Sequence, residues 1–224
     1  MALMSDHRFR SIVLASIVAA VGFYLLRTPG PLPTALVVLK GTGVGLLAIL
    51  ALIYGEGRYG GPLTGIMLLG ALGDVLIEYD LIAGAAAFLV GHLLALAFYL
   101  RNGRANPAPS QKLLALAIVV IVPILGWWMP SDRSMALVTF TYALALALMA
   151  AAAWMSRFSR YRVGIGAVLF VLSDLLIFAR GGPLASSNLP HLLIWPLYYL
   201  GQLLICLGVL RTIHSAAFGA RIDR

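Results

Sequence analysis

The sequence predicts an all-α, polytopic membrane bundle of eight transmembrane helices. Hydrophobic residues make up 62% of the 224 residues and charged residues only 11%, a balance that excludes an ordinary soluble domain. The apolar residues occur in runs of about 17 to 22, the length that a helix needs to cross roughly 30 Å of hydrocarbon. Short Gly, Pro or Arg stretches separate these runs, so lipid is the solvent of this fold.

The first four helices are predicted over residues 11–27, 33–54, 62–79 and 81–100. The first run follows basic residues, as a signal peptide does, but no small-residue cleavage site comes after it, so we expect a retained helix. Prolines in the segment 29–33 separate it from the second run. The third and fourth runs are almost continuous, and we expect Glu78 and Asp80, at the turn between them, to be solvated.

The last four helices are predicted over residues 112–129, 134–155, 163–179 and 190–211. The longest connection, 101–111, contains Pro107 and Pro109 and is too short for a soluble domain. Residues 1–224 are therefore expected to form a single integral membrane domain. Cys206 is the only cysteine and lies in the last run, where we expect a small core residue.

Basic residues predict the orientation, because cytoplasmic loops retain Lys and Arg more readily than translocated loops. Twelve lie on one side of the predicted membrane: Arg8, Arg10, Arg58, Arg101, Arg104, Lys112, Arg157, Arg160, Arg162, Arg211, Arg221 and Arg224. Three lie on the other: Arg27, Arg133 and Arg180. Both termini are therefore expected to be cytoplasmic. The same distribution explains the net charge of +8 without nucleic-acid binding, since the basic residues form no stripe.

Two aspartates lie inside apolar runs, in the similar strings LLGALGDVLIEYD (Asp74) and VLFVLSDLLIFAR (Asp174). A carboxylate in hydrocarbon costs several kcal/mol unless it faces protein or water, so each is a functional-site hypothesis. The two are 100 residues apart, which aligns helices 1–4 with helices 5–8. A shift of four helices preserves direction, so the sequence predicts two parallel four-helix repeats, which puts a shared site between the halves.

Other polar residues share the depth of these aspartates. At about 1.5 Å per residue, Lys40 lies roughly 10 Å below the outer surface, and both aspartates roughly 8 Å below it. His92, Tyr198 and Gln202 lie at about 12 to 18 Å. We therefore expect one cavity in the outer half of the membrane. Its predicted lining residues are Lys40, Asp74, His92, Ser173, Asp174, Tyr198 and Gln202.

A structural interpretation stays open for each of these residues. Lys40 can extend toward the surface, and the aspartates can form ion pairs with Lys40 or Arg180 that join helices. His92 alone fits a hydrogen-bonded core histidine. The remaining polar residues fit helix packing or an aromatic interface.

The strings VVLKGTG, ALGDVL, FLVGHLLALAFY, GAVLFVLSDLLIFAR and YYLGQLLICLGVLR together resemble the YhhN-like lysoplasmalogenase family of eight-helix membrane proteins. The resemblance runs from helix 2 to helix 8, although Gly41 replaces the usual proline after the helix 2 lysine. It implies hydrolysis of the vinyl ether bond of lysoplasmalogens to a fatty aldehyde and a glycerophospho-alcohol. The expected partners are the lyso-phospholipid substrate and membrane lipids, in a bacterial inner membrane.

This reaction requires a proton donor, a charge that stabilises an oxocarbenium-like cation, and a positioned water, as in glycosidases. Burial favours the protonated carboxyl and a nearby cation the ionised one. We therefore predict Asp174 as general acid and Asp74 as the ionised stabiliser or base, although the reverse assignment fits nearly as well. Lys40 and His92 complete the predicted catalytic residues. The predicted substrate-binding residues are Ser173, Tyr198, Gln202 and Arg180, with the Arg180 side chain at the depth of the phosphate.

The sequence lacks residues that other mechanisms would require. A catalytic zinc normally takes three protein ligands, and only His92 shares the depth of the aspartates, so we expect no metal and no cofactor. A serine triad is disfavoured because no GxSxG string occurs. The alternative from another class is a proton-coupled transporter or channel, but the inner half of the membrane has no matching charged residues. The sequence predicts no oligomeric state.

Overall fold

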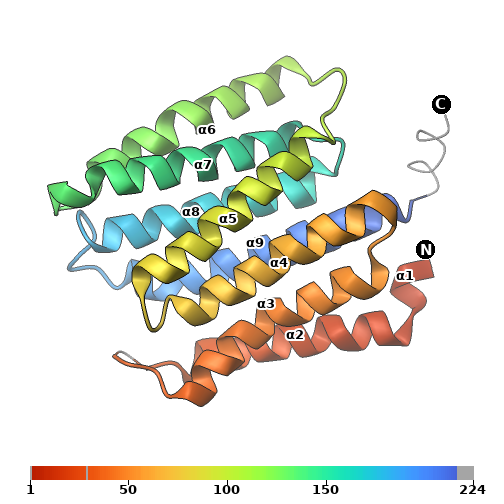
Figure 1. The fold of residues 1–224 in the computed structure, drawn as a ribbon, viewed down its shortest axis with the longest axis horizontal. Coiled ribbons are helices and arrows are strands. Elements are labelled where there is room, and N and C mark those ends of the chain that lie inside the picture. Colours follow the sequence, from red (N-terminus) through yellow and green to blue (C-terminus); the bar gives the residue numbers. More distant parts are fainter. Residues whose placement is uncertain (1, 29, 216–224) are drawn as a thin grey trace. The chain divides into compact units, whose positions relative to one another are not determined.

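The computed structural model describes residues 2–28 and 30–215, and every regular element in them is a helix (Figure 1). Eight of these helical segments are long and apolar enough to cross a membrane, which confirms the predicted fold class. Their helices are α2 (His7–Leu26), α3 (Thr34–Tyr54), α4 (Gly57–Leu76), α5 (Leu81–Leu100), α6 (Pro109–Trp128), α7 (Ala136–Met155), α8 (Ile165–Arg180) and α9 (Leu189–Ile213). Three short helices adjoin them: α1 (Ala2–Ser5), the 3₁₀ helix η1 (Arg133–Met135) and the π-helix η2 (Arg160–Gly164).

Two helices begin before the predicted apolar runs, α2 at His7 and α4 at Gly57. Helix α2 begins at His7 because the Asp6 carboxylate accepts a hydrogen bond from the backbone N–H of Arg8, at 2.8 Å. The other Asp6 oxygen accepts from the Tyr54 hydroxyl at 2.7 Å, and this bond is the main cause of a lowered pKa for Asp6. Helix α4 begins at Gly57, so Pro62 lies inside the helix, where it removes one backbone hydrogen bond.

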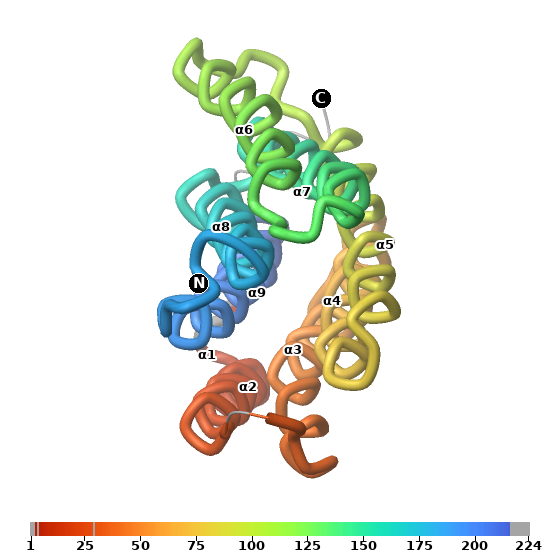
Figure 2. The backbone as a smooth tube through the Cα atoms, turned by 90° about the vertical axis from the view of Figure 1, so that its left-hand side faces the viewer, coloured from red at the N-terminus to blue at the C-terminus, as the bar shows by residue number. Residues whose placement is uncertain are grey.

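The chain divides into two compact units. Unit 1 comprises residues 1–95 and 206–224, and unit 2 comprises residues 96–205, so the divisions fall within α5 and α9. In unit 1, α2 packs on α3 and α3 on α4; in unit 2, α6 packs on α7 and α7 on α8 (Figure 2). The single domain and the parallel repeat stay predictions.

Aliphatic side chains fill the centre of unit 1. Val44, Leu47 and Leu50 of α3 and Leu63 and Met67 of α4 are fully buried. A polar contact joins α2 to α3, since the Ser16 hydroxyl of α2 donates to the Gly43 carbonyl of α3 at 2.6 Å. Cys206 is also fully buried, as predicted for a small core residue.

Small residues allow α6 and α7 to approach closely in unit 2. Ala143, Ala147 and Ala150 of α7 are completely buried. A Cβ atom on Gly126 of α6 would lie 2.6 Å from the Cβ atom of Ala143, so only glycine fits there. Membrane helices associate largely through such close backbone packing, because lipid provides no hydrophobic drive between helices.

Large aliphatic side chains cover the outer faces of the helices. Leu25 is 73% exposed, Ile82 71% and Leu113 69%, exposures that suit contact with lipid. The chain is therefore a multi-pass membrane protein. Arg221 and Arg224, counted above with the basic side, lie outside the described residues.

Candidate active site

Unit 1 contains an ion pair between two helices that carry predicted site residues. Lys40 of α3 lies with its Nζ atom 2.5 Å from the Glu78 Oε1 atom, in the turn after α4. The Lys40 and Glu78 side chains are 11% and 25% exposed. The Lys40 Nζ atom also lies 5.8 Å from the centre of the Phe23 ring of α2, within the range of a cation–π interaction. Lys40 is therefore a buried cation with an acidic and an aromatic neighbour.

The register of α3 against α4 explains this pair. A Cβ atom on Gly41 would lie 2.6 Å from Val75 Cγ2, and one on Gly45 would lie 4.0 Å from the Ala71 Cβ. These contacts step by four residues in opposite directions along the two helices, as they must in an antiparallel pair. Lys40 precedes Gly41, so it lies level with the end of α4.

Asp74 and His92 are the other candidate residues of unit 1. Asp74, in α4 one turn before Glu78, is 2% exposed, and His92 of α5 is 3% exposed. Glycines again bring their helices together: a Cβ atom on Gly73 would lie 2.8 Å from the Phe88 ring of α5. Unit 1 therefore holds a deeply buried carboxyl group and a deeply buried imidazole on two tightly packed helices.

Asp174 is the buried carboxyl group of unit 2. It is 5% exposed, and its Oδ2 atom accepts a hydrogen bond from the Tyr142 hydroxyl of α7 at 2.9 Å. The Tyr142 ring meets the Phe178 ring edge to face, with centroids 5.9 Å apart and planes at 90°. Phe178 lies one helical turn after Asp174 on the same face of α8. The contact between the Tyr142 and Phe178 rings therefore orients the Tyr142 hydroxyl toward the Asp174 carboxyl group.

A second polar group of unit 2 lies along α9. The Gln202 amide donates to the Tyr198 hydroxyl at 3.4 Å, and the Tyr198 ring packs edge to face on Phe170 of α8. Both Tyr198 and Gln202 are buried, at 4% and 2% exposure. The Gln202 Oε1 atom is buried and has no hydrogen-bond partner among the described residues. A buried amide oxygen of this kind is an acceptor for a water or a substrate hydroxyl.

Backbone contact between α8 and α9 brings these residues to one interface. A Cβ atom on Gly166 would lie 2.7 Å from the Gly201 carbonyl oxygen, and one on Gly201 would lie 2.7 Å from that of Gly166. Ser173, at 1% exposure, donates its hydroxyl to the Ile194 carbonyl of α9 at 3.0 Å. That bond accounts for the Ser173 hydroxyl proton, while the oxygen lone pairs can still accept from a ligand.

Arg180 differs from the other seven predicted site residues, all of which are buried. It is the last residue of α8 and is exposed. His191, near the start of α9, is exposed as well. In the part of the chain that the structure describes, no group of three or more His, Cys, Asp or Glu side chains is arranged to hold a metal ion.

Comparison with known proteins identifies the family. A family model described as the YhhN family matches residues 35–209, which include every candidate residue above. The chain belongs to the YhhN family. No solved structure matches this YhhN-family protein.

Relatives of this YhhN-family protein carry the name lysoplasmalogenase. Lysoplasmalogenase TMEM86B of Sus scrofa is 34% identical over 173 residues, covering 73% of this chain and 70% of the relative. Lysoplasmalogenases of Mycobacterium bovis and Mycobacterium tuberculosis are each 28% identical over 173 residues, which cover 73% of this chain and 66% of their own length. The mycobacterial matches thus extend over about two thirds of those proteins.

Two residues outside the predicted site, Glu78 and Tyr142, bind side chains that belong to it. Glu78 is exposed, as predicted, but its carboxylate also pairs with Lys40, a partner that the sequence did not predict. Tyr142 was not considered, although a tyrosine in the middle of an apolar run is itself a signal of a buried partner. The glutamate that pairs with Lys40 lies one turn after Asp74, in the turn that follows α4.

Proposed function

We propose that this YhhN-family protein is a membrane lysoplasmalogenase, which hydrolyses the vinyl ether bond of a lyso-phospholipid. Support comes from the family, from relatives that carry this name over most of the chain, and from two carboxyl groups buried in apolar helices. A buried carboxyl group is costly in a membrane, and acid–base chemistry accounts for that cost. The observation that carries the proposal is the hydrogen bond between Tyr142 and Asp174 inside unit 2.

The reaction starts with transfer of a proton to the outer alkene carbon of the vinyl ether. This step leaves an oxocarbenium-like cation, and water then adds to the carbon that bears the ether oxygen. The resulting hemiacetal collapses to a fatty aldehyde and a glycerophospho-alcohol. The protein must therefore supply an acid, a negative charge near the cation, and a base or acceptor for the water.

In this mechanism Asp174 is the general acid. The Tyr142 hydroxyl donates to Oδ2, so the transferred proton would come from Oδ1. After the transfer Asp174 is a carboxylate, and the bond from Tyr142 strengthens because its acceptor has become charged. Tyr142 thus stabilises the product of the proton transfer more than the reactant, which is the condition for accelerating this step.

Asp74 is the ionised group that stabilises the cation, with Lys40 and His92 setting its charge state. The Lys40 and Glu78 pair adds no net charge to the group, and it fixes the ammonium position near the end of α4. The mechanism assigns both carboxyl groups to the same reaction. Because the two groups would then act as one catalytic unit, their substitutions should not be additive.

The remaining candidates bind substrate and water. Gln202, through its Oε1 atom, accepts from the attacking water or from a glycerol hydroxyl, while Tyr198 holds the amide in place. Ser173 offers its oxygen lone pairs in the same unit. Arg180, at the exposed end of α8, has the planar donors that suit the substrate phosphate. We propose that the substrate head lies at that end and that its chain lies deeper.

A panel of lyso-lipids tests the reaction class. Purified protein in detergent is given lyso-lipids that share headgroup and chain length and differ only in a vinyl ether, alkyl ether or ester link at glycerol C1. Release of fatty aldehyde from the vinyl ether lipid alone is the expected result. Release of fatty acid from the ester lipid would contradict the proposal, because an esterase does not need to protonate an alkene.

The same assay separates the enzyme from a transporter, because a transporter shows no turnover without compartments. No relative described above is named as a transporter, so the comparisons do not favour that alternative. Addition of a chelator tests the metal mechanism, and activity should persist. Activity that disappears with chelator and returns with zinc would replace the carboxylate mechanism with a metal one.

The proposed orientation places both termini in the cytoplasm, in a bacterial inner membrane. A reporter fused after Arg224 should be cytoplasmic, and one inserted near Ser187 should be external. The reverse result would place the candidate residues in the cytoplasmic half and change the leaflet that supplies the substrate.

A further inference from the structure

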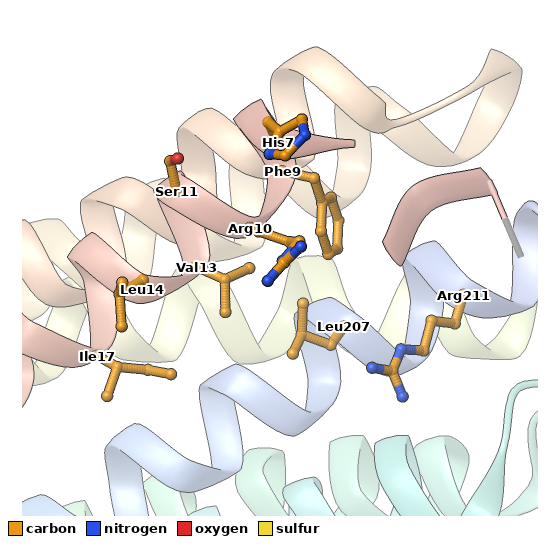
Figure 3. A pocket seen from close by; sticks show the side chains of 9 residues that line it. All are labelled: His7, Phe9, Arg10, Ser11, Val13, Leu14, Ile17, Leu207 and Arg211. Carbon is orange, nitrogen blue, oxygen red and sulfur yellow. The ribbon is translucent and has the colours of Figure 1, made fainter. Parts of the chain in front are cut away.

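Unit 1 contains a pocket of about 540 Å³ between the first half of α2 and the last turns of α9 (Figure 3). None of the candidate active-site residues lines it. Within unit 1 it lies far from the Lys40 and Glu78 pair, because Lys40 contacts Phe23 near the other end of α2. The 13 residues from Arg10 to Phe23 correspond to about 20 Å along the helix. The pocket therefore needs its own explanation.

One end of the pocket is basic. Arg10 of α2 and Arg211 of α9 both line it, and their side chains flank Leu207 in Figure 3. His7 and Ser11 add two further polar side chains from the first turns of α2. Of the described residues that line the pocket, none is acidic. Two guanidinium groups from different helices form a site suited to a phosphate, which each can bind with paired N–H donors.

The other end of the pocket is apolar. Val13, Leu14 and Ile17 follow Arg10 along α2, and Leu207 lies across from them on α9. From Arg10 to Ile17 the helix rises about 10 Å, the direction in which an acyl chain would run from a head at the membrane surface. Leu14 is 62% exposed, although it is a large aliphatic residue. This end of the pocket therefore matches an acyl chain and not a second polar ligand.

We propose that this pocket binds an anionic phospholipid of the leaflet in which α2 begins and α9 ends. Its phosphate lies between Arg10 and Arg211, and one acyl chain runs along Val13, Leu14 and Ile17. Basic pockets between transmembrane helices bind anionic lipid headgroups by the same combination of charge and apolar area. The bound lipid bridges α2 and α9, so it stabilises unit 1.

The test compares lipids of equal chain length on purified protein in detergent. Native mass spectrometry counts the lipids that stay bound, and thermal unfolding measures the stabilisation. The probes are phosphatidylglycerol, phosphatidylcholine and inorganic phosphate. We expect phosphatidylglycerol to bind and to raise the melting temperature, and phosphatidylcholine and free phosphate to do neither at the same concentration.

An Arg10→Gln, Arg211→Gln double variant should bind phosphatidylglycerol about tenfold to thirtyfold more weakly. Its control is an Arg58→Gln, Arg162→Gln variant, which removes the same charge from exposed residues outside the pocket. If the double variant does not fold, Arg10→Gln alone, at an exposed position, provides the comparison with a smaller loss. The test measures lipid binding, so its result does not depend on catalytic turnover. An Asp174→Asn protein should therefore bind phosphatidylglycerol as the wild type does.

Three results would overturn the proposal. Equal binding of phosphatidylglycerol and phosphatidylcholine would mean that the arginines do not select an anionic head. Equal weakening in the control variant would assign the effect to overall charge. Tight binding of inorganic phosphate alone would mean that the apolar end of the pocket has no part in recognition.

Discussion

Replacing Tyr142 by Phe isolates one hydrogen bond of the candidate site. The substitution removes only the hydroxyl that donates to Asp174 Oδ2 at 2.9 Å, and it keeps the ring that packs edge to face on Phe178. Unit 2 should therefore fold as before, with a loss in stability of about 1 kcal/mol. Any larger effect on turnover then reports on the reaction.

The size of the effect follows from the change in charge of Asp174. A neutral hydrogen bond contributes about 0.5–1.5 kcal/mol, and one to a charged group about 1.5–3 kcal/mol. Asp174 gains its charge during proton transfer, so the bond gains about 1–1.5 kcal/mol in the transition state. Since 1.36 kcal/mol equals a factor of ten, Tyr142→Phe should lower kcat about tenfold and leave KM within a factor of two.

The assay is steady-state release of aldehyde from a vinyl ether lyso-lipid by purified protein. Tyr161→Phe is the matched control, because Tyr161 also belongs to unit 2 but is 67% exposed, and its kcat should not change. In an Asp174→Asn background, Tyr142→Phe should cause no further loss. The reasoning is refuted if Tyr142→Phe raises KM alone, or if it lowers kcat equally in both backgrounds.

Three further predictions concern stability in detergent. Lys40→Met should lower the melting temperature more than the Lys40→Met, Glu78→Gln double variant does, because the single change leaves a partly buried carboxylate without its cation; equal losses would contradict this. A tyrosine hydroxyl of α3 lowers the pKa of Asp6 from 3.8, so this bond stabilises the fold above about pH 4 and is lost as the pH falls through the lower, folded-state pKa. The difference in melting temperature between wild type and Asp6→Asn should therefore shrink in acid, and a constant difference would argue against the bond. Gly126→Ala should destabilise by about 1–3 kcal/mol through its contact with α7, whereas Gly61→Ala, with open space around it, should be neutral or stabilise by up to about 1 kcal/mol; similar effects at both positions would refute the packing argument.

The eight helices could be predicted from the sequence because each must bury its backbone polar groups within a single apolar run. Their ends were less predictable. Helix α2 starts at His7, among charged residues, because Asp6 caps it, and hydropathy cannot detect a cap. Helix α4 starts before Pro62, since a single missing hydrogen bond does not end a helix that neighbouring helices support.

The buried candidate residues were predictable because an ionisable or amide side chain in an apolar run must find a protein environment. Their partners were not. The pairing of Lys40 with Glu78 depends on the register of α3 against α4, which the contact of Gly41 with Val75 defines. The pairing of Asp174 with Tyr142 joins residues 32 apart on different helices. A tyrosine in an apolar run indicates that its hydroxyl has a partner, but the sequence does not indicate which residue that is.

The most direct test of the central claim is turnover of a vinyl ether lyso-lipid by three carboxyl variants. Asp174→Asn and Asp74→Asn should each lower the rate of aldehyde release by about 10² to 10⁴, the usual contribution of general acid catalysis. The double variant should release aldehyde about as fast as the less active of the two single variants. Asp132→Asn, which removes a carboxylate from a surface turn, should retain wild-type activity. Wild-type turnover by a well-folded Asp74→Asn, Asp174→Asn double variant would contradict the carboxylate mechanism.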